Sequence, residues 1–355
     1  MKKHVKFMKK CLELAVQGKN KTGTNPLVGC VIVYNNITIS DGYHEKYGGY
    51  HAEKNAINNL KKKHPTDYKK LLEQSTLYVN LEPCSHFGKT PPCIDLIIKY
   101  KIPQIIIGTM DPFTQVNGKG INKLKKYSKV IVGILEKECL EINHQYFTNH
   151  IFNRPFIILK WAESKDGFIN TKSKGIKKIS NKDSIQLSHK WRSQVDAIMV
   201  GTNTVICDNP TLTTRKFKGN NPIRVTIDRK NRLTHKNWNI LNHESNTIIF
   251  NEKLSKKEHN IEYINYMNYK YQDKGNLIIM MKILYEKGIK SILIEGGAQL
   301  LNNYINNNLW DEARVFVSNK ILNDGVKAPK FNYKNKDTNN IKVDSDSLYI
   351  KKNYQ

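Results

Sequence analysis

One histidine, one glutamate and two cysteines have the types and spacing to do chemistry together. His51 and Glu53 form a His-x-Glu pair, and Cys84 follows Pro83. A second cysteine, Cys93, comes after eight intervening residues. Catalytic zinc is held by three nitrogen, oxygen or sulfur ligands, and its fourth position is left for water. The sequence therefore predicts a zinc site made of His51, Cys84 and Cys93.

Glu53 lies two residues from the histidine ligand and need not bind the metal itself. Zinc lowers the pKa of bound water toward neutrality, which makes the water nucleophilic. Hydrolytic deamination also needs a carboxylate to move protons between that water, the ring nitrogen and the leaving ammonia. His-x-Glu followed by Pro-Cys-x-x-Cys is the signature of zinc deaminases, although the spacing between the cysteines is longer here. We expect Glu53 to be the catalytic acid and base.

Short apolar strands alternate with helices along the first 150 residues. This alternation predicts a layered α/β domain. His51 opens a predicted helix and Cys84 follows a predicted strand, and a helix N-terminus favours the thiolate that a metal requires. The expected strands are 28–34, 76–82, 104–110 and 129–134, with a second short strand after a turn at 35–36, and the expected helices are 5–17, 51–63, 92–100, 118–127 and 136–149.

The second half of the chain repeats the α/β pattern. Arg154-Pro155 interrupts the preceding helix, so we place a boundary near 148–154, between domains 1–148 and 154–355. Residues 230–275 show little pattern outside one strand, and the last twenty residues contain one apolar stretch that suggests an edge strand. The expected strands are 156–162, 195–201, 222–228, 246–251, 291–297 and 313–321, with a helix at 298–309.

Composition narrows the class of protein. The net charge is +27, but the excess of Lys and Arg is spread over both halves without a basic tail, which argues against nucleic acid as the main partner. The six cysteines are scattered along 355 residues, which suggests a reducing compartment and a cytoplasmic protein. No apolar run approaches the roughly 18 residues of a membrane-spanning helix, so we expect no membrane partner.

Several longer segments resemble one family, the bifunctional deaminase/reductases of riboflavin biosynthesis. The resemblance runs from about residue 5 to 325. It implies an N-terminal cytidine-deaminase-like three-layer α/β domain and a C-terminal dihydrofolate-reductase-like α/β domain. The segments are NPLVGCVIV (25–33), HAE (51–53), LEPCSHFGKTPPC (81–93), MDPFTQVNGKG (110–120), LKWAESKDG (159–167), WRSQVDAIMVGTNTVICDNPTLTTR (191–215), PIRVTID (222–228) and ILIEGG (292–297).

The resemblance also implies substrates, cofactors and an oligomeric state. A Zn²⁺ deaminase would hydrolyse 2,5-diamino-6-ribosylamino-4(3H)-pyrimidinone 5′-phosphate, and an NADPH reductase would then convert the ribosyl group to ribityl. The partner would be this phosphorylated pyrimidine, in a homodimer or homotetramer. Matched by position, the deaminase pocket would contain Asn25, His44, Ser85, His86, Lys89 and Asp111.

The reductase residues follow from the same match. The substrate would meet Lys160, Ile176, Arg192, Leu212, Arg215 and Glu295. The cofactor would meet Ala162, Lys178, Thr204, Asp208, Arg229 and the segment Gly297, Ala298, Gln299, Leu300, Leu301, Asn302 and Asn303. Glycines and a helix N-terminus in that segment suit a phosphate.

Five positions depart from the usual family residues. Phe113 replaces Asn, Lys165 replaces Leu, Ile176 replaces Ser, Lys178 replaces Trp and Arg229 replaces Ser. An arginine fork suits phosphate, so we hypothesise that Arg229 meets the 2′-phosphate of NADPH.

Two other interpretations remain open at the level of sequence. The chain could be a nucleic-acid deaminase, such as a tRNA adenosine deaminase, with an appended binding half. It could also be non-catalytic, with a structural zinc or a decayed active site, although a structural site normally has four protein ligands.

Overall fold

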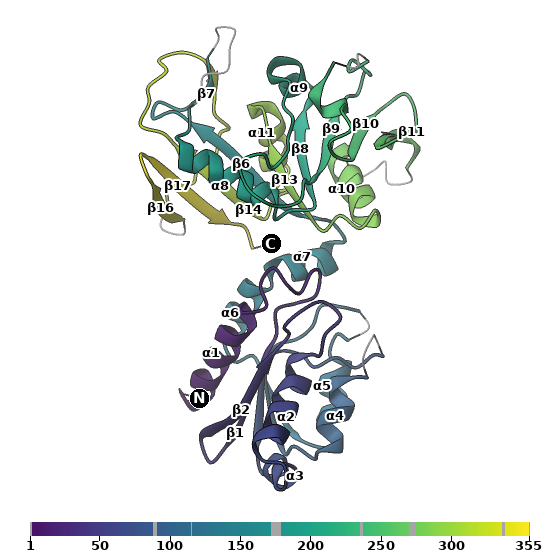
Figure 1. Ribbon diagram of the computed structural model, residues 1–355, viewed down its shortest axis with the longest axis vertical. Coiled ribbons are helices and arrows are strands. Elements are labelled where there is room, and N and C mark those ends of the chain that lie inside the picture. The colour runs from purple at the N-terminus through teal and green to yellow at the C-terminus, as the bar shows by residue number, and fades with distance from the viewer. Residues whose placement is uncertain are drawn as a thin grey trace. The chain divides into compact units, whose positions relative to one another are not determined.

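The computed structural model describes residues 2–87, 91–114, 116–171, 179–234, 237–269, 275–335 and 338–354. The chain divides into two compact units, Met1–Phe152 and Asn153–Gln355 (Figure 1). This division falls within the interval 148–154 where Arg154-Pro155 predicted it.

The first unit contains a mixed five-stranded sheet in the order β2-β1-β3-β4-β5. Strands β1 (Gly29–Tyr34) and β2 (Ile37–Tyr43) form an antiparallel hairpin. Asn35 and Asn36 both have positive φ at its turn, as a two-residue hairpin loop requires. Strand β3 (Thr76–Leu81) is antiparallel to β1, and β4 (Gln104–Thr109) and β5 (Lys129–Val132) continue the sheet in parallel.

Helices cover both faces of this sheet, which gives the three layers. Because successive strand residues point to opposite faces, Val31 and Val33 pack with the core of α1 (Lys2–Val16) and α6 (Glu136–Ile142). Cys30 and Ile32 pack with the opposite core, beside α2 (Ala52–Lys63), α4 (Cys93–Lys99) and α5 (Lys119–Leu124). A short helix, α3 (Tyr68–Leu72), was not predicted.

The single helix expected at 136–149 is wrong, because the structure has two helices there. Helix α6 ends at Ile142, and α7 spans His144–Phe152. Asn143, between them, uses its side chain to accept from the backbone N–H of Leu27 (2.7 Å) and to donate to the Leu27 carbonyl (2.9 Å). These tertiary bonds fix the break, and sequence periodicity carries no signal for them.

The second unit is built on a ten-stranded sheet in the order β11-β12-β10-β9-β8-β13-β6-β14-β17-β16. The seven strands from β12 to β14 are parallel, and antiparallel strands lie at both ends. The strands are β6 (Phe156–Glu163), β8 (Ala197–Gly201), β9 (Ile223–Ile227), β10 (Thr247–Asn251), β11 (Lys256–Glu258), β12 (Ile261–Asn265), β13 (Ser291–Glu295), β14 (Glu312–Val317), β16 (Asn339–Val343) and β17 (Asp346–Lys352), with β7 (Phe168–Asn170) and β15 (Val326–Lys327) as a separate pair.

Two expectations for this unit need correction. The apolar stretch near the C-terminus is β17, which pairs with both β14 and β16, so the edge strand is the more polar β16. The weakly patterned segment 230–275 contains β11 and β12 in addition to β10, together with the short 3-10 helices Asn239–Leu241 and Tyr266–Asn268.

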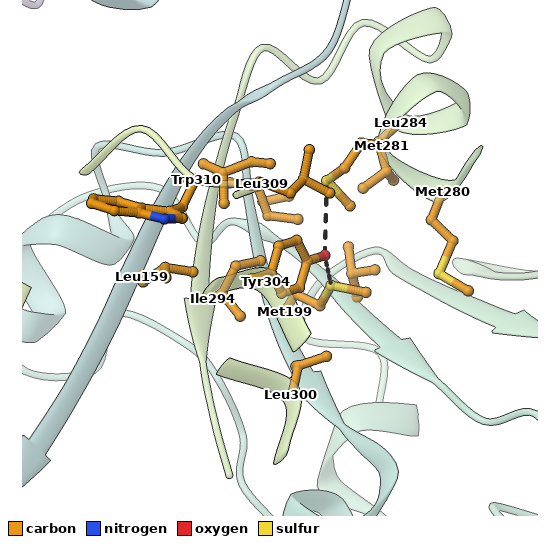
Figure 2. Packing of buried hydrophobic residues seen from close by; sticks show 14 of the residues in the cluster. Leu159, Met199, Met280, Met281, Leu284, Ile294, Leu300, Tyr304, Leu309 and Trp310 are labelled. Carbon is orange, nitrogen blue, oxygen red and sulfur yellow. Dashed lines mark hydrogen bonds between the residues drawn. The ribbon is translucent and has the colours of Figure 1, made fainter. Parts of the chain in front are cut away.

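Helices complete the second unit: α8 (Lys182–Arg192), α9 (Thr202–Asp208), α10 (Asn276–Glu286) and α11 (Ala298–Asn306). Residues of α10 and α11 pack into the main core of this unit (Figure 2). At its centre the buried Tyr304 hydroxyl donates to the sulfur atoms of Met199 (3.2 Å) and Met281 (3.9 Å). Buried hydroxyls need an acceptor, and here thioether sulfur provides it.

Candidate active sites

The three predicted metal ligands converge in the first unit. His51 Nδ1 lies 3.4 Å from Cys84 Sγ and 3.5 Å from Cys93 Sγ, and all three ligand atoms lie within 4.8 Å of one another. Tetrahedral zinc, with bonds of about 2.3 Å to sulfur and about 2.0 Å to nitrogen, places neighbouring ligand atoms roughly 3.5 Å apart. The donor set and both distances from the histidine nitrogen to the sulfur atoms therefore fit zinc.

Helix N-termini position these ligands. His51 is the residue before α2, and Cys93 is the first residue of α4. The backbone N–H of Cys93 donates to Cys84 Sγ (3.3 Å). Hydrogen bonds from Cys93 and His51 lower the pKa of the Cys84 thiol, which favours the thiolate form that binds metal.

Glu53 lies in the first turn of α2 and is only 3% exposed. Burial raises its pKa above the ordinary value for glutamate. A carboxyl group with a raised pKa exchanges protons more readily near neutral pH, which is the property required of a catalytic acid and base. Its environment is therefore suited to the role that the His-x-Glu spacing predicted.

Asn25 and His44 form a polar pair beside the metal ligands. The His44 ring contacts the His51 ring at 5.5 Å between centroids. His44 Nδ1 is 3.0 Å from the Tyr50 carbonyl, which can only accept, so Nδ1 carries the proton. His44 Nε2 then accepts from the Asn25 amide (3.1 Å), and burial lowers the His44 pKa, which favours this neutral form.

The loop after β4 holds Asp111 close to the segment that carries the metal ligand Cys84. Buried Glu82, two residues before Cys84, accepts from the backbone N–H groups of Asp111 (3.2 Å), Gly118 (2.9 Å) and Ile121 (3.1 Å). A side chain at Gly120 would meet the Pro83 carbonyl at 2.7 Å, so glycine permits this close approach. Sequence reasoning missed Glu82, although it stands inside the motif LEPC.

The remaining deaminase candidates are less fully placed. His86 lies against Phe113, with ring centroids 5.4 Å apart. Ser85 follows Cys84 directly and is partly buried. Lys89 lies outside the described residues.

The second unit contains a cavity of about 1310 Å³ at the C-terminal ends of its central strands. Ligands bind there in open α/β sheets. Most of the predicted reductase residues line it: Lys160, Ala162, Arg192, Thr204, Asp208, Leu212, Arg229, Glu295, Gly297, Ala298, Gln299, Leu300 and Asn303.

The lining of the cavity includes a largely buried charge cluster. The Arg192 guanidinium donates to both oxygens of Glu295, at 3.0 Å and 2.6 Å. Burial alone would raise the Glu295 pKa, but Arg192 and Lys160 lower it to about 2. Burial lowers the pKa of Lys160. His189 of α8 is buried nearby, and burial followed by the charges of Arg192 and Arg215 lowers its pKa to about 4.

The lining also carries groups suited to a dinucleotide phosphate. The Gly297 N–H donates to Thr204 Oγ1 (3.0 Å) just before α11, whose N-terminus faces the cavity. Arg229 forms an exposed ion pair with Glu252 at 2.7 Å. Sequence reasoning missed Asn203, Lys230 and Arg232, which also line the cavity; the basic run after β9 was the available signal.

Some predicted reductase residues lie away from this lining. Leu301 is fully buried in the core, and the side chain of Asn302 accepts from the backbone N–H of Lys330 (3.1 Å). Arg215 is exposed and donates to Thr213 (3.1 Å). Ile176 and Lys178 lie outside the described part of the chain.

A deaminase-type metal site in a three-layer unit and a dinucleotide-sized cavity in a second unit define a two-domain deaminase and reductase. Residues 1–109 match the family model for the cytidine and deoxycytidylate deaminase zinc-binding region, and residues 155–343 match the RibD C-terminal domain. The chain belongs to the RibD family of riboflavin biosynthesis, and the two folds are cytidine-deaminase-like and dihydrofolate-reductase-like.

Individual relatives cover nearly the whole chain. The riboflavin biosynthesis protein RibD of Aquifex aeolicus is 36% identical over 331 residues, covering 90% of this chain and 88% of that protein. The RibD of Buchnera aphidicola is 35% identical, with 94% and 92% covered. The crystal structure of the deaminase/reductase of Thermotoga maritima matches with a TM-score of 0.78, 32% identity and 99% of each chain covered.

These matches favour the deaminase/reductase interpretation over the nucleic-acid deaminase. The second half of the chain is the reductase domain of the family, so it is not an appended nucleic-acid-binding domain. Within the described residues, every helix is too short or too polar to cross a bilayer.

Proposed function

We propose that this bifunctional enzyme releases ammonia from 2,5-diamino-6-ribosylamino-4(3H)-pyrimidinone 5′-phosphate and then reduces the ribosyl group of the product to ribityl. The convergence of His51, Cys84 and Cys93 beside buried Glu53 is the observation that carries the first step. Relatives that cover both domains support the pairing with the second.

The deaminase roles follow from the geometry. Zinc bound by the three ligands would act as a Lewis acid that makes water nucleophilic near neutral pH. Glu53 accepts a proton as water attacks the ring carbon and returns it to the leaving nitrogen. Neutral His44, held by Asn25 and the Tyr50 carbonyl, and buried Asp111 provide polar contacts that orient the ring and its sugar.

Two groups of cavity-lining residues have different roles in the reductase. NADPH supplies the hydride in this second reaction. The N-terminus of α11 and Thr204 are placed to bind its phosphates. Arg192 and Lys160, which also line the cavity, hold positive charge toward the sugar phosphate while Glu295 fixes the Arg192 fork.

Arg229 is the candidate for recognition of the NADPH 2′-phosphate. Its guanidinium lies on the cavity wall near Lys230 and Arg232, which add positive charge. The Glu252 carboxylate competes for Arg229, but an exposed ion pair of this kind contributes only about 0–1 kcal/mol. A phosphate can therefore displace Glu252 at small cost.

The cytoplasmic location and the homo-oligomeric state stay predictions. Sedimentation velocity of the purified chain tests the oligomeric state, because a monomer, a dimer and a tetramer of a 41.1 kDa chain separate clearly.

The function is tested with purified, zinc-loaded protein and the pyrimidinone ribosylamine phosphate. Ammonia release and NADPH oxidation are followed separately. We expect ammonia first, abolished by a chelator, and then NADPH loss. Ammonia without NADPH loss would contradict the reductase half, and a folded, zinc-loaded sample that releases no ammonia would contradict the deaminase half.

A further inference from the structure

Asp111 is held by two hydrogen-bond donors that both bind the same carboxylate oxygen. The backbone N–H of Phe113 donates to Oδ1 at 2.9 Å, and the Tyr146 hydroxyl donates to Oδ1 at 3.0 Å. Among the described residues, none donates to Oδ2. The carboxylate is thus fixed in orientation while one oxygen keeps its capacity to accept.

Tyr146 reaches Asp111 from α7, a different part of the unit from the loop that carries Asp111. Its ring packs against His150 with centroids 4.4 Å apart, and the Phe113 ring lies 5.1 Å from His150. Phe113 in turn contacts His86, two residues beyond the ligand Cys84. These ring contacts restrict the Tyr146 side chain and hold its hydroxyl on the Asp111 side.

We propose that Tyr146 is a positioning residue for the deamination step, whose hydroxyl orients Asp111 so that Oδ2 accepts a hydrogen bond from an N–H or O–H group of the substrate. This inference rests on the proposed deaminase function. A substrate with a sugar and amino substituents offers several such donors. Tyr146 does not touch the reacting atoms, so it acts only through Asp111.

The ionisation of Asp111 gives this role a distinctive signature. Burial raises the Asp111 pKa to about 6, while the Phe113 N–H and the Tyr146 hydroxyl favour the charged form. Nearby Glu82 and Cys84 add smaller effects that raise the pKa. Removal of the Tyr146 hydroxyl should therefore raise the Asp111 pKa further. If the Asp111 carboxylate must be ionised to bind substrate, deaminase activity would then be lost at a higher pH as the solution is acidified.

The test is Tyr146→Phe, which removes one oxygen and keeps the ring contacts. The matched control is Tyr127→Phe, because Tyr127 is an exposed tyrosine of the same unit. A hydrogen bond to a charged group contributes enough for roughly a tenfold loss of kcat/KM in ammonia release. We expect this loss mainly in KM, with the acidic limb of the pH profile shifted to higher pH and zinc content unchanged.

A double-mutant cycle separates positioning from a general structural effect. In an Asp111→Asn background, Tyr146→Phe should cause little further loss if the hydroxyl acts through the Asp111 carboxylate. Additive losses, or a Tyr146→Phe enzyme with the KM and pH profile of the Tyr127→Phe control, would overturn the inference alone. A wild-type enzyme that releases no ammonia would overturn the proposed function as well.

Discussion

Replacement of Glu53 by glutamine should remove deamination and leave both metal binding and reduction intact. Glu53 is buried in the first turn of α2, and glutamine has nearly the same shape, so the packing around His51 is retained. The amide cannot take up and return a proton as the carboxylate does. The substitution thus isolates proton transfer from the rest of the site.

The size of the effect follows from the role. Proton transfer by a positioned side chain contributes about 10²–10⁴-fold to a rate. At about 1.4 kcal/mol per factor of ten, this is roughly 3–5 kcal/mol of transition-state stabilisation. We expect kcat for ammonia release to fall by at least about 100-fold, with a much smaller change in KM because Glu53 acts on the reacting atoms.

Three measurements on one preparation check this. Ammonia release reports the first site, metal analysis reports zinc per chain, and NADPH oxidation with the already deaminated compound reports the second site. Glu73→Gln is the matched control, since Glu73 is an exposed glutamate that follows α3 in the same unit. A Glu53→Gln enzyme with full zinc and ammonia release within threefold of the control would refute the assignment.

Three further predictions concern the second unit, which contains all four tryptophans, so that intrinsic fluorescence follows its unfolding. Arg154→Met breaks a buried bidentate pair with Asp311 (2.6 and 2.8 Å) and should lower the free energy of unfolding, measured in urea, by about 3–5 kcal/mol. The control Lys256→Met breaks an exposed pair with Glu258 and should lower it by less than about 1 kcal/mol. Equal effects of the two substitutions would contradict the prediction. Burial lowers the folded-state His189 pKa from 6.5 to about 4, so its contribution to stability is complete above pH 6.5 and is lost as the pH falls toward 4. The urea midpoint of His189→Gln should therefore depend less on pH between 6.5 and 4 than that of the wild type. An equal dependence of the midpoint on pH in both proteins would exclude the effect. Arg229→Ala should reduce the preference for NADPH over NADH in kcat/KM by roughly tenfold, since a charge-assisted contact to phosphate is lost, and an unchanged ratio would show that Arg229 does not meet the 2′-phosphate.

The metal site was the part of the molecule most fully predicted from sequence. His51, Glu53 and Cys84 stand at junctions between strands and helices, where local patterning is strong and zinc chemistry restricts the residue types. The long spacing between the two cysteines is compatible with the site, because Cys93 begins α4 and its backbone N–H donates to Cys84 Sγ. Local sequence and ligand chemistry point to the same arrangement here.

The features that sequence missed depend on contacts between distant residues. The break between α6 and α7 is set by Asn143 bonding to Leu27, 116 positions away. Tyr146 has no motif of its own, and its proposed role depends on the contact that α7 makes with the distant Asp111 carboxylate. In the second unit, helices α8 and α10 were not expected because their apolar residues lack a clear periodic stripe, and packing against the sheet stabilises them instead.

The strand order of the two sheets has a consequence for the order of events during synthesis. All strands and metal ligands of the first unit are present once residue 152 has been made. The first strand of the second unit, β6, lies between β13 and β14, which are translated near the end of the chain. The apolar strand β6 therefore has both edges unpaired until β13 and β14 have been synthesised. The deaminase unit can therefore be folded and loaded with metal while the reductase unit is still an incomplete nascent chain that needs protection from aggregation. Protease digestion of ribosome-stalled chains of increasing length would show the two units becoming resistant at different chain lengths.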